Sequence, residues 1–206
     1  MSQKPNILFM MPDQLRADFL GSYGAEFAKT PHLDALAATG TRFERCLSPN
    51  PICVPARASL LTGQTSVESG IMANDQWLRP DRRDCGIESW PELLGQAGYY
   101  TYGVGKMHFT PWEASEGFQT RVIAEDKRHT DIQDDYTDYL TRIGRQKIHG
   151  REMEGYVENA GAGYSPLSAE QYRERGGAEP AIELLAAHEV EQPCALKMGV
   201  PSPAGP

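Results

Sequence analysis

The sequence predicts an α/β domain with a mainly parallel central sheet, because short apolar segments alternate with helical patterns along the chain. The first apolar segment, residues 6–11, ends abruptly at a proline and an aspartate, which is typical of a fully buried strand in a parallel sheet. Residues 99–104 and 195–200 are expected to form two more strands. Ligands bind beyond the carboxyl ends of such strands, so Asp13 and Lys106 are the first candidates for a site.

Helical patterns separate these strands. The first opens at Thr30-Pro31 and stops at Gly40. Ser89 has the character of an N-cap and is followed by an early proline, which predicts a helix that reaches about residue 97. Amphipathic helices are also expected over residues 134–145 and 179–189.

Three segments between these elements are less regular. Residues 41–47 can form a short strand, and residues 48–55 form a loop that contains three prolines. The helix that follows is expected to start at Ala56 and to end at Gly63. Residues 150–163 are rich in glycine and are expected to form a loop that either covers a site or is mobile.

The composition of the 206-residue chain is that of an ordinary globular protein, with 40% hydrophobic and 23% charged residues. The net charge of −8 and the lack of a basic cluster argue against a nucleic-acid-binding function. No segment approaches the roughly 20 apolar residues of a membrane span, and no signal-peptide pattern is present, so we expect a cytoplasmic protein. The four cysteines include no Cys-x-x-Cys pair and no zinc-binding spacing.

A dense motif surrounds one of these cysteines. Residues 51–63 read Pro-Ile-Cys-Val-Pro-Ala-Arg-Ala-Ser-Leu-Leu-Thr-Gly and contain Cys-x-Pro-x-Arg followed by Leu-Thr-Gly. This run resembles the signature of the sulfatase family, in which the cysteine is converted to Cα-formylglycine. Val54 departs from the pattern, since the family usually has a smaller residue there. The resemblance implies that Cys53 is the nucleophile, once a formylglycine-generating enzyme has modified it.

Formylglycine suits this role because its hydrate carries two hydroxyls on one carbon. One hydroxyl attacks sulfur, and the other loses its proton so that sulfate leaves as the aldehyde re-forms. Arg57 lies about one helical turn after Cys53, so both side chains can face one cavity, where the guanidinium would hold the hydrate and an anionic substrate. The helix N-terminus near Cys53 also favours anions. An arginine at this spacing is otherwise commonly a surface residue.

The end of the first apolar segment carries the second resemblance. The Pro-Asn-Ile-Leu-Phe start is similar to the first strand of many sulfatases, whose final acidic residues bind a divalent metal. Many members have two aspartates there, whereas this chain has Asp13 followed by Gln14, as in the choline-sulfatase and phosphonate-monoester-hydrolase branches. The resemblance implies that Asp13, Gln14 and modified Cys53 bind a metal, with Ca²⁺ first and Mn²⁺ or Mg²⁺ as alternatives. Asp13 could instead cap a loop or helix.

A third resemblance lies in residues 103–108, Gly-Val-Gly-Lys-Met-His, which match the family's Gly-Lys-x-His at a strand end. It implies that Lys106 contacts sulfate and formylglycine, and that His108 bonds to the hydrate and accepts its proton. Asn74 matches a polar substrate contact of the same branches. The spacing of a full phosphate-binding loop is absent.

The resemblance is good from residue 4 to residue 123 and weaker afterwards. It implies an alkaline-phosphatase-like sandwich around the parallel sheet, with residues 1–206 as the N-terminal part of a catalytic domain whose C-terminal part is missing. Residues 173–180 depart from the family pattern, as a local frameshift would produce. Pro201-Ser-Pro203 resembles a loop about halfway through a sulfatase.

The function implied is that of a sulfuric ester hydrolase acting on a small sulfate ester, with neither a nucleic acid nor a membrane as partner. Two alternatives stay open. One is a phosphonate or phosphate monoester hydrolase of the same superfamily, and the other is a catalytically incompetent fragment. Homo-oligomerisation of a full-length protein also stays open.

Overall fold

The computed structural model of the chain describes residues 4–125, 131–148, 152–159, 167–168, 171 and 173–200, without the side chains of residues 173–177. Only residues 152–159 of the glycine-rich segment expected at 150–163 belong to this set, and Pro201-Ser-Pro203 lies outside it. None of the described helices is long and apolar enough to cross a membrane.

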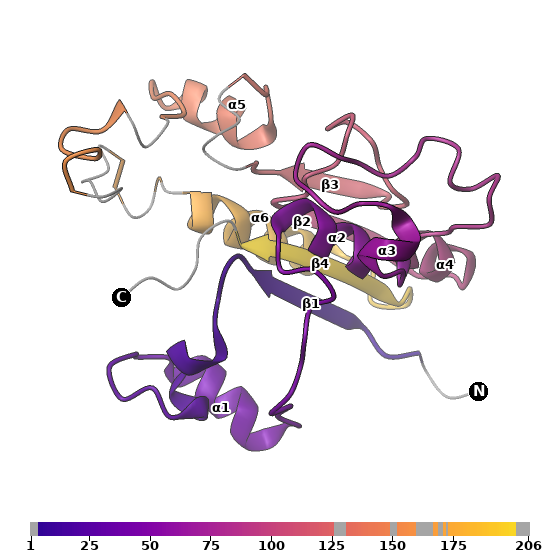
Figure 1. Cartoon of the computed structure of the whole chain (residues 1–206), viewed down its shortest axis with the longest axis horizontal. Coiled ribbons are helices and arrows are strands. Elements are labelled where there is room, and N and C mark those ends of the chain that lie inside the picture. Colours follow the sequence, from indigo (N-terminus) through magenta and orange to yellow (C-terminus); the bar gives the residue numbers. More distant parts are fainter. Residues whose placement is uncertain are drawn as a thin grey trace.

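A four-stranded, entirely parallel sheet forms the centre of the fold (Figure 1). Its strand order is β1-β4-β2-β3, so the two central strands are the second and the last along the chain. The register places Ile7 opposite Ala195 and Tyr102 opposite both Leu196 and Thr120. The predicted α/β class with a parallel sheet is therefore confirmed. The strand bounds are β1 Ile7–Pro12, β2 Tyr100–Gly105, β3 Thr120–Ile123 and β4 Cys194–Val200.

The α-helices lie where the sequence patterns place them, except that the helix Ser66–Ser69 was not predicted; three further differences concern two helix starts and one expected strand. The α-helices are α1 Pro31–Thr39, α2 Cys53–Thr62, α3 Ser66–Ser69, α4 Trp90–Gln96, α5 Asp135–Arg142 and α6 Arg173–Ala187. Two 3₁₀ turns, η1 Ala17–Phe19 and η2 Gly21–Tyr23, precede α1.

The first difference concerns the start of α2, which was expected at Ala56 and lies at Cys53. Pro55 does not prevent this because it occupies the third position of the helix, where a backbone N–H has no intrahelical partner. The second difference is that α6 begins at Arg173 instead of 179. The third is that residues 41–47 form no strand, because no described strand pairs with them and Phe43 and Leu47 remain exposed.

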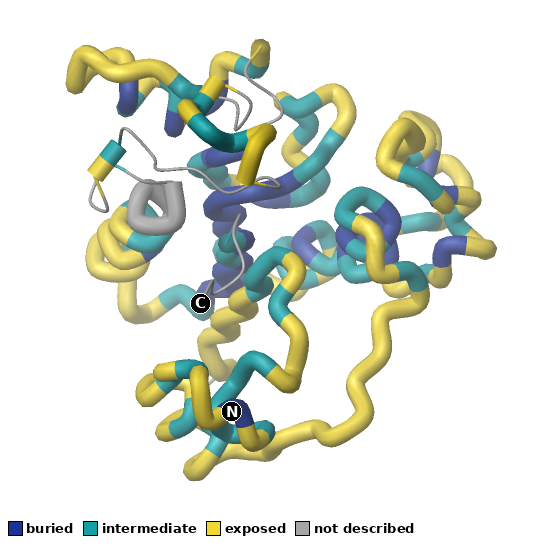
Figure 2. The backbone as a smooth tube through the Cα atoms, turned by 60° about the vertical axis from the view of Figure 1, so that its left-hand side comes forward, coloured by how far each residue is buried: buried dark blue, intermediate teal, exposed yellow. Residues whose placement is uncertain are grey.

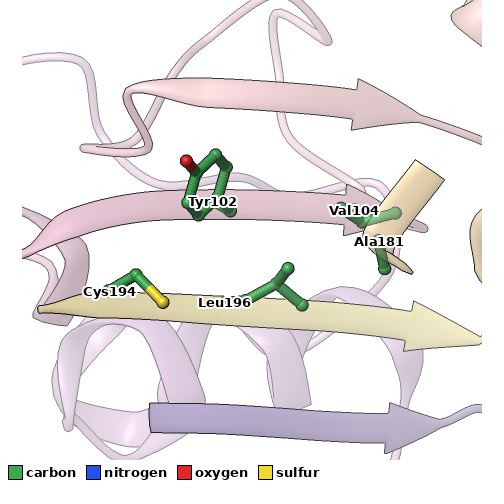
Figure 3. Close-up of a cluster of buried hydrophobic side chains, with 5 residues drawn as sticks. All are labelled: Tyr102, Val104, Ala181, Cys194 and Leu196. Carbon is green, nitrogen blue, oxygen red and sulfur yellow. The ribbon is translucent and has the colours of Figure 1, made fainter. Parts of the chain in front are cut away.

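The two faces of the sheet are covered by different elements. Tyr102 and Val104 of β2 pack with Cys194 and Leu196 of β4 and with Ala181 of α6 (Figure 3). The opposite face carries a second cluster, made of Leu61, Met107 and Phe118, which brings α2 against the end of β2. Strand side chains alternate between faces, and Gly103 of β2 faces this second cluster, since a Cβ there would lie 2.9 Å from Met107 Cε and 3.0 Å from Phe118 Cγ.

The expectation of a fully buried first strand was wrong. β1 lies at the edge of the sheet and pairs only with β4 (Figure 1). Its apolar side chains stay exposed, with Leu8 at 54% and Met10 at 44%. Figure 2 shows the same contrast along the backbone, since the centre is buried and the segment around the N-terminus is mostly exposed or intermediate.

Candidate active site

The first turn of α2 holds Cys53, and a distant residue completes its N-terminus. The residue before the helix, Ile52, has no side-chain oxygen that could cap it. Asn74 supplies this oxygen, because its Oδ1 accepts a hydrogen bond from Val54 N at 3.0 Å. Asn74, predicted as a substrate contact, therefore also orders the turn that carries Cys53.

Four of the predicted side chains come together where β1 and β2 end. Lys106 Nζ lies 2.5 Å from Asp13 Oδ2 and 3.6 Å from Cys53 Sγ. Arg57 Nη2 lies 3.8 Å from Asp13 Oδ1, and Cys53 Sγ lies 4.0 Å from the same oxygen. A thiol sulfur lies here, where the sequence resemblance predicts the formylglycine hydroxyls. The cluster thus combines the predicted nucleophile with one acidic and two basic side chains.

Two glycines allow this cluster to form. A Cβ on Gly105, which has φ of 81°, would lie 2.0 Å from Gly199 O. A Cβ on Gly199 would lie 2.4 Å from Lys106 O. Side chains at either position would therefore separate the ends of β2 and β4, from which Lys106 N donates to Gly199 O at 3.1 Å. This close approach leaves Lys106 fully buried.

Lys197 is a third basic side chain near this end of the sheet that sequence reasoning missed. Its Nζ donates to Lys106 O at 2.6 Å, and Arg57 Nη1 donates to the same carbonyl at 2.9 Å. Burial lowers the pKa of Lys197 well below its usual value, and the neighbouring Arg57 lowers it further. The signal was a lysine inside an otherwise apolar strand, since lysine is almost never fully buried without a partner.

His108 follows in a turn fixed by a second residue that sequence reasoning missed, Glu125. His108 adopts a left-handed backbone conformation with φ of 56°, which a non-glycine residue rarely takes. Glu125 Oε1 accepts hydrogen bonds from Met107 N at 2.9 Å and from His108 N at 2.8 Å. The signal available in the sequence was a carboxylate just after a strand, but β3 itself had not been predicted.

A cavity of about 470 Å³ adjoins the cluster. Phe109 and Trp112 give it an aromatic wall, and Asp131 adds a carboxylate at its rim. The predicted residues Asn74 and His108 line it too. The remaining lining residues are Val54, Thr110, Pro111, Glu125 and Ile132. The site therefore has room for an organic group beside the nucleophile position.

The predicted metal ligands are only partly assembled. Gln14 follows Asp13 with φ of 55° and is exposed, while the Asp13 carboxylate faces Lys106 and Arg57. Within the described ranges, no group of three or more histidine, cysteine, aspartate or glutamate side chains could hold a metal ion. Asp13 and Gln14 supply hard oxygen atoms, but far fewer than the six to eight that Ca²⁺ typically takes.

Comparison with known proteins gives a consistent result. The family model described as Sulfatase matches residues 5–193. The chain is 40% identical over 123 residues to the ulvan-active sulfatase of Formosa agariphila, covering 56% of this chain and 23% of that protein. It is 35% identical over 122 residues to the choline-sulfatase of Rhizobium meliloti, covering 59% of this chain and 23% of that protein.

A solved structure with a similar fold is the phosphonate monoester hydrolase of Agrobacterium radiobacter, with a TM-score of 0.71 and 21% identity. The match covers 96% of this chain and 41% of that chain. At this identity the likeness shows the fold alone. The chain thus spans less than half the length of each of these three proteins.

Proposed function

The chain belongs to the sulfatase family, and from this premise we propose that it carries the nucleophile side of a sulfuric ester hydrolase site. The observation that carries the proposal is the cluster around Cys53, whose Sγ lies 3.6 Å from a fully buried lysine. A structural cysteine needs no such surroundings, whereas a nucleophile that attacks an anionic ester needs cations beside it.

We propose that Cys53 acts after conversion to formylglycine by a formylglycine-generating enzyme. The hydrated aldehyde supplies two hydroxyls on one carbon: one attacks sulfur and displaces the alcohol of the ester, and deprotonation of the other expels sulfate as the aldehyde re-forms. Lys106, buried and within reach of both Cys53 and Asp13, stabilises negative charge as it develops on the sulfuryl oxygens. Arg57 holds the anionic group from the neighbouring turn of α2.

His108 is proposed to accept the proton of the hydrate, since an imidazole titrates close to neutral pH. It lines the cavity beside Val54, so the organic part of the ester would lie against the wall formed by Phe109 and Trp112. Asn74 lines the same cavity, which keeps its predicted contact with substrate possible in addition to its bond to the α2 turn.

A divalent metal is part of the proposal, as is general in this family. Asp13, Gln14 and modified Cys53 are the proposed ligands, and Ca²⁺ is the first choice because the donors are hard oxygens. These residues do not complete a coordination shell. The proposed roles of Arg57, Lys106 and His108 depend on their own charges and hydrogen bonds.

The proposal is tested first by producing the chain together with an active formylglycine-generating enzyme. Mass spectrometry of the tryptic peptide 46–57 should show loss of H₂S and gain of one oxygen at Cys53, and no change at Cys46. A thiol that persists at Cys53 would refute the proposed nucleophile.

Hydrolysis is then measured in a chimera in which residues 5–193 replace the matching segment of the Rhizobium choline-sulfatase. Sulfate esters should be cleaved, and Cys53→Ala should abolish turnover. Phosphonate monoesters are assayed in parallel. Faster cleavage of phosphonates would favour the alternative hydrolase, and activity that survives Cys53→Ala would exclude both.

A further inference from the structure

Glu125 makes contacts with His108 that exceed what the turn alone requires. The carboxylate is 2% exposed, and Oε1 accepts both Met107 N and His108 N. The second oxygen, Oε2, is buried and has no hydrogen-bond partner among the residues the structure describes. His108 Nε2 lies 3.7 Å from this oxygen.

This separation is slightly longer than a hydrogen bond. Catalytic hydrogen bonds are often long in a ligand-free site and shorten only with substrate. A buried carboxylate oxygen without a partner is costly, so the nearby ring nitrogen is the group that can satisfy it. The ring is itself largely buried, with 5% of the side chain exposed.

Hydrogen bonds on the side away from His108 involve the backbone of Glu125 and the carboxylate of Asp134. Its backbone N donates to Asp134 Oδ2 at 2.7 Å, and Lys147 Nζ donates to the same oxygen at 2.7 Å. The other oxygen of Asp134 accepts Thr137 N at 2.9 Å and so caps α5. Asp134 is 1% exposed. The chain of contacts thus runs from a helix N-terminus through two buried carboxylates to His108.

We infer that Glu125 is a positioning residue that holds the strained turn at His108 and orients the imidazole through its Nε2–H. The inference rests on the proposed function only in giving His108 a catalytic task. A carboxylate facing Nε2 favours the ring form in which Nε2 carries a proton. The opposite nitrogen, Nδ1, would then be the one able to accept a proton in the neutral ring.

The substitution Glu125→Gln separates this role from a purely structural one. The side-chain amide oxygen can still accept Met107 N and His108 N, so the turn is retained. The amide nitrogen then faces Nε2 and donates to it, which favours the opposite tautomer with the proton on Nδ1. Glu125→Ala removes both interactions. Glu113→Gln is the matched control, because Glu113 is an exposed carboxylate outside the cavity lining.

The ring nitrogens are observed by long-range ¹H–¹⁵N NMR on the unmodified full chain, with His108 assigned by its absence in His108→Gln. The expected result is a protonated Nε2 in the wild type, a protonated Nδ1 in Glu125→Gln, and no change in Glu113→Gln. Hydrogen exchange at the Met107 and His108 amides should remain slow in Glu125→Gln and become fast in Glu125→Ala.

Identical His108 ring spectra in the wild type and Glu125→Gln would overturn the inference, whatever Glu125→Ala does to folding. The measurement needs neither modified Cys53 nor turnover. An inactive chimera together with the tautomer exchange would refute the proposed function and leave the positioning role standing. An active chimera with unchanged ring spectra would refute the positioning role of Glu125 and leave the proposed function standing.

Discussion

Single residues of α2, β4 and the end of β2 supply the basic side chains of the site. Arg57, Lys106 and Lys197 converge there, while Asp13 and Glu125 are the described carboxylates whose charges reach Lys197. Arg57 and Lys106, beside Asp13 and Cys53, leave the site suited to an anionic ester. Lys197 has the least favourable surroundings of the three, because it has no carboxylate within ion-pair distance among the described residues.

The lowered pKa of Lys197 should be visible in how the free energy of unfolding depends on pH. Its pKa is lowered well below the usual value of about 10.5, so the unfolded chain binds more protons over the range below that value. Stability contributed by Lys197 therefore increases as pH rises towards about 10.5, the usual pKa of lysine. Urea unfolding of the wild type and Lys197→Met should show a free-energy difference that shifts in favour of the wild type over this range. Lys29→Met, at an exposed lysine, is the control, and parallel curves for wild type and Lys197→Met would contradict the assignment.

The residues of the site differed in how far sequence could predict their places. Cys53 and Arg57 could be placed together because a separation of four residues puts them on one side of a helix. The contact of Lys106 with Asp13 followed from the rule that parallel strands end at one edge. Glu125 could not be placed, because its contact with His108 depends on β3 pairing beside β2.

At the scale of elements, the start of α4 is the most firmly specified helix terminus. Ser89 Oγ and the Glu92 carboxylate form a capping box, in which Glu92 Oε2 accepts Ser89 N at 2.6 Å. Arg82, which is 4% exposed, joins Glu92 to Glu116 through distances of 2.7 Å and 2.5 Å. The capping residue was predictable from the local sequence, whereas the arginine came from a separate turn. The N-terminus of α2 likewise depends on a residue from a separate segment, Asn74, whose contact the local sequence could not predict.

Substitution of Glu92 should weaken this terminus in a pH-dependent way. Burial opposes ionisation of Glu92, but hydrogen bonds from Arg82 and Ser89 outweigh it and lower its pKa to about 2. Glu92→Gln should therefore destabilise the chain by about 1–3 kcal/mol near neutral pH, as expected for loss of a buried charged partner. The difference should vanish as pH falls from about 4.5 towards 2, where the wild-type carboxylate becomes protonated.

Denaturant unfolding at several pH values checks this, with Glu88→Gln as control because Glu88 is an exposed carboxylate next to the cap. An equal effect of Glu92→Gln at both ends of the pH range would contradict the ionic contribution.

Elements without such local capping signals were the ones that sequence reasoning misplaced. The apolar residues of the expected strand at 41–47 found no partner strand, and the four-residue β3 was too short to show alternation.

The molecule as a whole is built on a parallel sheet whose central strands are covered and whose edge strand β1 is exposed. β2 and β4 are central and lie between the cluster with α6 and the cluster with α2. β1 has one paired edge and one edge without a strand among the described residues. The apolar run that predicted a buried strand was thus interpreted correctly as a strand, but its burial depends on contacts that a sequence pattern cannot reveal.

This exposed strand leads to a prediction about association. Leu8 and Met10 point to one face of β1, Ile7 and Phe9 point to the other, and all four are 36% to 54% exposed. An exposed apolar strand with an unpaired edge is a template for pairing with another chain. Size-exclusion chromatography with light scattering should therefore show self-association of the wild-type chain that grows with concentration.

The double substitution Leu8→Lys with Met10→Lys should shift the chain towards monomer, because the two charges repel an approaching copy without removing the β4 pairing. Val190→Lys is the matched control, since Val190 is 88% exposed and belongs to the connection between α6 and β4 instead of to β1. A wild-type chain that is monomeric at every concentration would contradict the prediction. Equal association of the double variant would show that a different surface, such as the exposed apolar side chains near Phe43 and Leu47, mediates the contact.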